Sequence, residues 1–146
     1  MQSAAGISAL STETGVRGVI ARDGAGALVP ELVMGHAVIL TGAVRDEGTS
    51  FHYLAAGRVV SADPGPAESL AGALSAAAVE TTHGLNGSMD AIYRETRARV
   101  SRQVEEGCLV VEMEASALMA IARYRSARWS WPGTRWPAGS GSTVGG

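Results

Sequence analysis

The chain has 146 residues, of which 46% are hydrophobic and 18% charged, so it is long enough for one globular domain and too apolar for a disordered segment. Its net charge of −2 argues against the strongly basic surface that nucleic acids or anionic membranes attract. No apolar run approaches the roughly 20 residues of a membrane-spanning helix, and the first ten residues lack the features of a signal peptide. We therefore expect a cytoplasmic protein that binds neither nucleic acid nor membrane.

The first half of the chain alternates strand-like and loop-like segments. Apolar runs predict strands at Gly18–Ala21 (GVIA) and His36–Val44 (HAVILTGAV), with the glycine-rich loop Asp23–Leu28 (DGAGAL) between them. The segment DPGP, residues 63–66, is a helix-start signal. A helix is expected from Ala67 to about Val79, and apolar residues recur along one of its faces at Leu70, Ala73, Leu74 and Ala77.

The second half continues the alternation of strands and helices. A weak strand is predicted at Val79–His83, and an exposed helix at Thr96–Glu106 ends at the expected C′ glycine, Gly107. Leu109–Val111 predicts a short buried strand. The following segment, Met113 to about Tyr124, is apolar on nearly all sides, as in a buried helix. Strands separated by helices predict an α/β domain whose sheet is largely covered.

The chain contains one cysteine, Cys108, at the head of the apolar stretch CLVV. A lone cysteine excludes an internal disulfide and fits a reducing compartment. The apolar neighbours favour a buried structural thiol over a nucleophile.

The composition changes near residue 125. The segment 126–146 mixes Trp-Pro pairs with glycine and serine and shows no helical or strand period, and it holds Trp129, Trp131 and Trp136. Three exposed tryptophans need a covering partner, so the segment is either an aromatic docking tail or the product of translation in another reading frame. We favour the second interpretation. The sequence thus predicts a domain over residues 1–125 and an irregular tail over residues 126–146.

Two carboxylates interrupt an otherwise apolar run in LVVEMEASALMA, residues 109–120. The triplet Glu112, Met113 and Glu114 lies where a predicted strand passes into a helix, and ligand sites of open α/β sheets favour the carboxyl ends of strands. A carboxylate there can accept hydrogen bonds from both hydroxyls of a ribose, while the methionine thioether packs against the sugar. The alternative is a glutamate that caps the helix or forms an ion pair.

Three further segments carry polar side chains at predicted turns. In TGAVRDEGTSFHYL, residues 41–54, Arg45 can pair with Asp46 or Glu47, as a turn network or as an acid–base pair, and His52 is either a proton donor or a packed side chain. These residues do not form a metal-ligand spacing. The loop DGAGAL can approach an anion closely. In HGLNGSMDAIYRET, residues 83–96, Tyr93 and Arg94 suit either a flat heterocycle or a surface loop.

These segments, in this order, resemble the nucleoside phosphorylase family, and the nearest part of it is the uridine-phosphorylase-like branch. The resemblance rests on VEMEAS, on TGAVRDEGTS followed by HYL, and on the SxDAxYRET loop, and it extends from about Gly15 to Tyr124. It implies a three-layer α/β fold with a mixed central sheet flanked by helices, here incomplete, and homo-hexamers built from dimers. The implied reaction is phosphorolysis, in which inorganic phosphate attacks a nucleoside and releases the free base and ribose 1-phosphate.

The resemblance also assigns residues to the substrate site, and it implies no metal and no organic cofactor. It implies that Glu112, Met113 and Glu114 contact the ribose. A loop for phosphate and base comprises Arg22, Gly24, Ala25 and Gly26, and the base-facing residues are Ile92, Tyr93 and Arg94. No residue is assigned as catalytic.

The chain departs from the family pattern in its anion site. Ala21 occupies the position of a phosphate-binding arginine, with Arg22 next to it, and Asp23 would repel phosphate. Thr96 and Ala98 replace the residues that contact uracil. The family's first phosphate loop and the strand after the EME helix have no counterpart, so we expect a truncated chain without activity of its own. The alternatives are a hydrolytic nucleosidase of the same fold and a non-catalytic remnant that packs with intact subunits.

Overall fold

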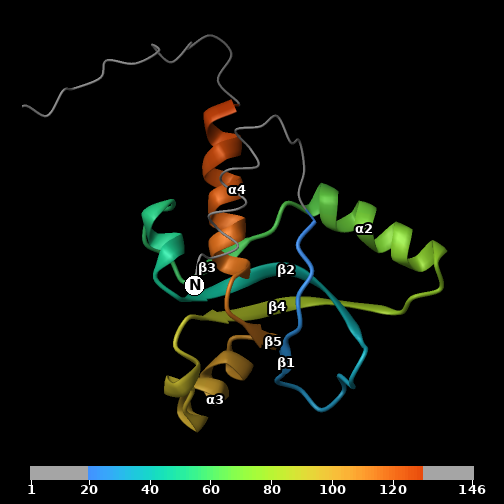
Figure 1. The fold of residues 1–146 in the computed structure, drawn as a ribbon, viewed down its shortest axis with the longest axis horizontal. Coiled ribbons are helices and arrows are strands. Elements are labelled where there is room, and N and C mark those ends of the chain that lie inside the picture. The colour runs from blue at the N-terminus through green and yellow to red at the C-terminus, as the bar shows by residue number, and fades with distance from the viewer. Residues whose placement is uncertain (1–19, 130–146) are drawn as a thin grey trace, which may run out of the picture.

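The computed structural model describes residues 20–129, and side chains up to residue 125. Its five strands form one mixed sheet in the order β1-β5-β4-β2-β3 (Figure 1). The three central strands, β2, β4 and β5, are parallel to one another, whereas β1 and β3 add antiparallel edges. The strands are β1 (Gly26–Ala27), β2 (Ala37–Asp46), β3 (Val59–Ser61), β4 (Thr81–Met89) and β5 (Cys108–Glu112).

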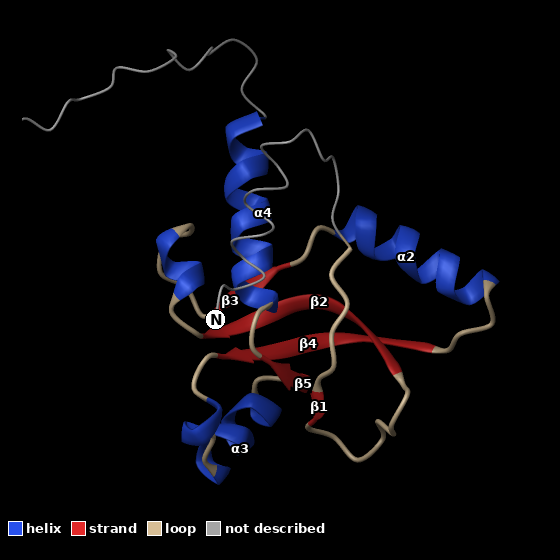
Figure 2. Cartoon of the chain, viewed as in Figure 1, coloured by secondary structure: helices blue, strands red, loops and turns tan. Residues whose placement is uncertain are grey.

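Helices lie on both faces of this sheet. Gly87 and Ser88 are consecutive residues of β4 and therefore point to opposite faces. Ser88 accepts a hydrogen bond from the first turn of α4, whereas Gly87 faces Gln103 of α3. Figure 2 shows α4 and α3 on opposite sides of the strands. The three-layer α/β fold is confirmed, with helices α2 (Pro64–Ala76), α3 (Arg97–Glu105) and α4 (Ala115–Trp129) and the short 3₁₀ helices η1 (Thr49–His52) and η2 (Ile92–Arg94).

The core between α4 and the sheet is built from small side chains. Ala43 of β2, Val60 of β3 and Ala115 of α4 form one buried cluster. At the neighbouring Gly42, an added Cβ would lie 2.8 Å from the backbone oxygen of Val60, so a glycine is needed for β2 and β3 to approach this closely. The compact core brings the N-terminus of α4 directly over the ends of the central strands.

The predicted helix signals are confirmed by local contacts. Asp63 caps α2 by accepting a hydrogen bond from the backbone N–H of Gly65 at 3.1 Å, and Thr96 caps α3. Gly107 has a φ of +88°, the left-handed conformation expected after a helix end. The predicted apolar face of α2 is only half-buried at Leu70 and Leu74.

Three predicted boundaries are corrected. Ile20 and Ala21 are irregular, and the first strand of the described chain is Gly26–Ala27, inside the segment predicted to be a loop. The strand predicted to end at His83 continues to Met89. The prediction stopped too early because the added segment contains small or polar residues, Gly84, Asn86, Gly87 and Ser88, which are uncommon in strands.

The last helix is longer and less buried than predicted. It runs to Trp129 rather than Tyr124, so residues 126–129 are helical, and residues 130–146 with the other two tryptophans lie outside the described part. Ala120 and Ile121 are buried, but Ala122 and Arg123 are exposed. No helix in the described residues is long and apolar enough to cross a membrane.

Candidate functional site

Polar side chains gather at the edge where the parallel strands end. Asp46, the last residue of β2, lies opposite Met89, the last residue of β4. Ser88 in turn lies opposite Glu112, the last residue of β5. The carboxyl ends of three neighbouring parallel strands therefore meet at one edge, the usual place for a ligand site in an open α/β sheet.

Glu112 uses both of its carboxylate oxygens within the protein. Oε2 accepts hydrogen bonds from the backbone N–H groups of Glu114 and Ala115, at 2.6 and 2.8 Å. Oε1 accepts one from the hydroxyl of Ser88 at 2.7 Å and one from the amide of Asn86. These four bonds fill the acceptor capacity of a carboxylate. Glu112 therefore acts as the helix cap that the alternative interpretation described. Its carboxylate oxygens have no acceptor position left for the ribose hydroxyls of its predicted role.

The N-terminus of α4 is also satisfied internally. The N–H groups of Glu114 and Ala115 bond to Glu112, and the N–H of Ser116 donates to the Ser88 hydroxyl at 2.9 Å. Free N–H groups at a helix start are what make it an anion site. These three donors are therefore not free to bind a phosphate.

A pocket of about 400 Å³ opens beside this turn. Met89 of β4, Val111 of β5 and Met113 provide its apolar wall, and Met89 is nearly fully buried. Glu114 also lines it and is half-buried. Among the described residues its carboxylate has no side-chain hydrogen-bond or ion-pair partner, and it accepts one hydrogen bond from the backbone of Met113. Burial raises the pKa of Glu114, with further contributions from the negative charges of Glu112 and Asp23.

More acidic side chains line the pocket than the sequence predicted. Four acidic residues and no basic residue of the described chain line it. The complete lining is Asp23, Gly24, Gly26, Met89, Ile92, Glu95, Val111, Glu112, Met113 and Glu114. Sequence reasoning missed Met89, Val111 and Glu95 as pocket residues. Met89 could have been found only by extending β4 to its true end.

The predicted loop residues separate into two groups. Gly24, Gly26 and Ile92 line the pocket with the EME triplet, but Ala25 does not. Arg22 lines an adjacent hollow of about 330 Å³ that it shares with Asp23 and Gly24.

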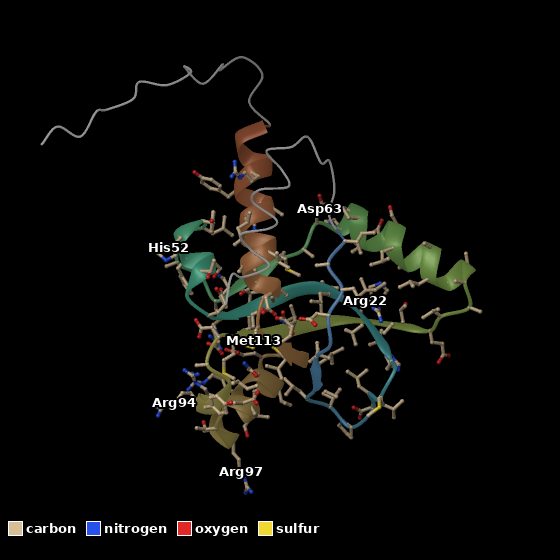
Figure 3. All side chains as sticks on the ribbon, viewed as in Figure 1. Arg22, His52, Asp63, Arg94, Arg97 and Met113 are labelled. Atoms are coloured by element: carbon tan, nitrogen blue, oxygen red, sulfur yellow. The ribbon has the colours of Figure 1, made fainter. Side chains whose placement is uncertain are left out.

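The other two base-facing candidates lie outside the pocket. Tyr93 is 99% exposed, and Arg94 is also exposed. Figure 3 shows Arg22 and Arg94 on opposite sides of Met113. The structure therefore brings Ile92, but neither Tyr93 nor Arg94, to the pocket.

The segment RDEGTS forms a hydrogen-bonded turn network, one of the two predicted alternatives, although without the pairing expected for Arg45. Arg45 does not pair with Asp46 or Glu47; it donates to the Ser50 hydroxyl at 2.8 Å and to the backbone oxygens of residues 54 and 55. Its guanidinium lies 4.1 Å from the ring centroid of Phe51. His52 is exposed on η1, away from the pocket lining.

Glu47 connects this network to α4. Its Oε2 accepts from the N–H of Ser50 at 2.9 Å and its Oε1 from the hydroxyl of Ser116 at 2.7 Å. Burial alone would raise the pKa of Glu47, but the hydrogen bonds from Ser50 and Ser116 outweigh it, so the pKa lies below its ordinary value. Glu47 is therefore a charged support for the α4 N-terminus.

Asp46 pairs with a more distant arginine. Arg58 donates to Asp46 and also forms an ion pair of 2.7 Å with Glu106. The hydrogen bond from Arg58 lowers the pKa of Asp46, against the opposing effect of burial. The same contacts raise the pKa of Arg58, that from Glu106 most.

Cys108 is a structural thiol, as predicted. It is 1% exposed, and burial raises its pKa to about 11. A thiol in that state is almost wholly protonated at neutral pH and unsuited to nucleophilic attack.

Comparison with known proteins identifies the family. The sequence pattern of the Phosphorylase superfamily matches residues 1–130. The chain belongs to the phosphorylase superfamily. It is 33% identical over 103 residues to guanosine phosphorylase from Halorubrum lacusprofundi, a match that covers 70% of this chain and 43% of that protein.

Solved structures of several proteins share the fold. A Plasmodium knowlesi homologue of the P. falciparum purine nucleoside phosphorylase superposes with a TM-score of 0.64 at 25% identity, over 70% of this chain and 43% of that one. A uridine phosphorylase from Vibrio fischeri gives 0.61 at 29% identity, over 69% and 43%. AMP nucleosidase from Bacteroides thetaiotaomicron gives 0.63 at 19% identity, a likeness of fold alone, over 70% and 45%.

The chain therefore spans less than half the length of these relatives. The predicted family is confirmed. The matched proteins are named for guanosine, purine nucleosides and uridine, and each match covers a similar share of this chain. The uridine-like branch therefore stays a prediction.

Proposed function

We propose that the pocket binds the ribose of a nucleoside and belongs to a nucleoside-cleaving site of the phosphorylase type. The observation that supports this is the state of Glu114. It is a half-buried carboxylate with a raised pKa and no side-chain hydrogen-bond or ion-pair partner among the described residues, and its one hydrogen bond, from the backbone of Met113, leaves acceptor positions open. A half-buried acid in this state gains from two hydroxyl donors.

The character of the pocket fits an uncharged ligand. Glu114 accepts from the 2′- and 3′-hydroxyls, Met113 packs on the sugar, and the apolar side chains of Met89 and Ile92 border the base. The described lining has four acidic side chains and no basic one, which disfavours an anion in the same space. A nucleoside therefore fits this pocket better than a nucleoside phosphate does.

Phosphate, the co-substrate of phosphorolysis, needs a separate place. Arg22, in the adjacent hollow, is the basic side chain next to the pocket, but Asp23 shares that hollow. One guanidinium beside a carboxylate holds phosphate weakly. We therefore expect no ribose 1-phosphate above background when this chain is incubated with phosphate and uridine, inosine or adenosine.

The acidic lining also supports a second candidate, a hydrolytic nucleosidase in which water replaces phosphate. Base release that is independent of phosphate concentration would identify it. A non-catalytic chain that packs with intact subunits would release no base under either condition. We retain two expectations as parts of the proposal: the cytoplasmic location expected from the sequence, and the assembly of dimers into hexamers that the family resemblance implies.

Ribose recognition is tested by titrating the purified chain with guanosine, inosine and uridine and with their 2′,3′-dideoxy analogues. We expect loss of the diol to weaken binding by about 100-fold or more, the cost of two hydrogen bonds to a charged group. The Glu114→Gln variant should lose this discrimination. The matched control is Glu95→Gln, which removes one negative charge from the same pocket and should keep it. Equal affinity of the wild type for both ligand series would refute the proposal.

A further inference from the structure

We infer that Glu112 is a positioning residue: clamped by Asn86 and Ser88, its carboxylate fixes the backbone that carries Glu114 and does not itself contact the sugar. This inference rests on the proposed ribose site. It assigns different roles to the two glutamates of the EME triplet, which the sequence and the family resemblance place together.

The first step is the contact between Glu112 and the backbone of Glu114. One carboxylate oxygen accepts both the N–H of Glu114, at 2.6 Å, and the N–H of Ala115, at 2.8 Å. Met113 and Glu114 form the bend between β5 and α4, where the carbonyl of Glu114 accepts the N–H of Leu118 and, among the described residues, the N–H of Glu114 bonds only to the Glu112 carboxylate. The carboxylate therefore determines the direction in which the Glu114 side chain leaves the backbone.

The second step is the clamp on Glu112 itself. Its other oxygen accepts hydrogen bonds from Ser88 and Asn86, both of which are fully buried in β4. The Ser88 hydroxyl donates to Glu112 and accepts from Asn86 and from the N–H of Ser116, which uses its entire hydrogen-bonding capacity. Glu112 cannot turn toward a ligand without leaving buried donors unpaired, which is costly.

The third step brings in the RDEGTS segment, which the proposed function did not explain. Ser116 is fully buried, and its hydroxyl donates to Glu47 at 2.7 Å while its N–H donates to Ser88. Glu47 is held in turn by Ser50. A continuous chain of hydrogen bonds thus runs from the loop after β2, through the first turn of α4, to Glu112. The support of Glu114 has one anchor in β4 and a second in this loop.

The test uses Ser88→Ala and Glu112→Gln in the full chain, each alone and combined with Glu114→Gln. The first removes the clamp, and the second places an amide among donors that need a carboxylate. Thr82→Val is the matched control, because it removes a hydrogen bond to His36 at the opposite end of the same strand. Two quantities are measured: hydrogen exchange of the Glu114 and Ala115 amides without ligand, and nucleoside affinity by NMR titration.

We expect Ser88→Ala and Glu112→Gln to accelerate exchange at these two amides and to weaken nucleoside binding by about 10-fold. In the Glu114→Gln background the same changes should have almost no further effect on affinity, because the carboxylate they position is gone. Thr82→Val should leave both quantities unchanged.

Two outcomes overturn the inference while the proposed function survives. If the affinity losses are equal with and without Glu114, then Glu112 contacts the sugar directly. If exchange at the two amides is unaffected, then Glu112 does not hold this backbone. A third outcome is different: accelerated exchange in a protein whose wild type binds no nucleoside refutes the ribose site, and the sugar-site role of Glu112 falls with it.

Discussion

Two acidic regions lie side by side at the same edge of the sheet, and they differ in how their carboxylates are satisfied. Beneath α4, Glu112 accepts four hydrogen bonds, and Glu47 accepts from Ser50 and Ser116. In the adjoining pocket, Glu114 accepts no hydrogen bond from another described side chain, and burial raises its pKa. The first region is complete in itself, and the second is the one that we propose a ligand completes.

This difference distinguishes carboxylates that stabilise the fold from carboxylates that are open to a ligand, and it does so without a comparison to related proteins. A carboxylate whose acceptors are filled stabilises the fold and has nothing left to offer a ligand. A half-buried carboxylate without donors carries a desolvation cost that a ligand can relieve. Glu112 and Glu114 are two residues apart in the sequence and belong to opposite classes.

The largest expected effect is on stability and concerns the first region. Glu112→Ala leaves the donors of Asn86, Ser88, Glu114 and Ala115 without an acceptor and should lower the free energy of unfolding by about 3 kcal/mol. Glu114→Ala should change it by less than about 0.5 kcal/mol, since it removes no bond to another side chain and only one local bond from the Met113 backbone. Urea unfolding followed by circular dichroism measures both. Similar losses for the two variants would show that the regions do not differ as described.

The next effect concerns pH: nucleoside binding and folding stability should be lost at different pH values. The pKa of Glu114 is raised above its ordinary 4.5, so its carboxylate, and with it ribose affinity, is lost as the pH falls through that raised value. The pKa values of Asp46 and Glu47 are lowered from 3.8 and 4.5. Their contribution to stability is present above those ordinary values and is lost only as the pH falls through the lowered ones.

Acidification should therefore abolish nucleoside binding before it unfolds the chain. Parallel titrations of nucleoside affinity and of the circular dichroism signal locate the two transitions. The Glu114→Gln variant is the control, since its weak residual binding should not change across the upper transition. Coincident transitions in the wild type would remove the distinction between the two regions.

The smallest expected effect concerns the base-facing segment. Ile92 lines the pocket, whereas its neighbour Tyr93 is 99% exposed. Ile92→Ala should weaken nucleoside binding several-fold through lost apolar contact, worth about 1 kcal/mol, and Tyr93→Ala should not. Isothermal titration of the two variants with inosine decides it. A larger effect at Tyr93 would mean that the base lies on the outer side of η2.

Much of the fold could be predicted because its signals are local. The DPGP segment starts α2, Gly107 ends α3, and the apolar run His36–Val44 lies almost entirely in β2. The extent of β4 could not be predicted, because Asn86 and Ser88 are loop-like residues with weak strand propensity. They belong to a strand here because each is itself buried and bonds to a partner 24 or 26 residues away, the half-buried Glu112.

The candidate site was predicted less completely than the fold. The EME triplet was correctly placed where a strand passes into a helix, but spacing alone does not distinguish its two carboxylates. The pairing expected for Arg45 failed for the same reason: its acceptors, Ser50 and the backbone of residues 54 and 55, become available only once η1 has formed.

The sequence by itself determined the family, the alternation of strands and helices, and the presence of two acids in an apolar segment, because these depend on residue order and short-range periodicity. Only the tertiary structure decided which acid is used internally and which faces a pocket. That decision depends on donors from β4 and from the loop after β2, which meet Glu112 and the α4 N-terminus only when the parallel strands have come into register.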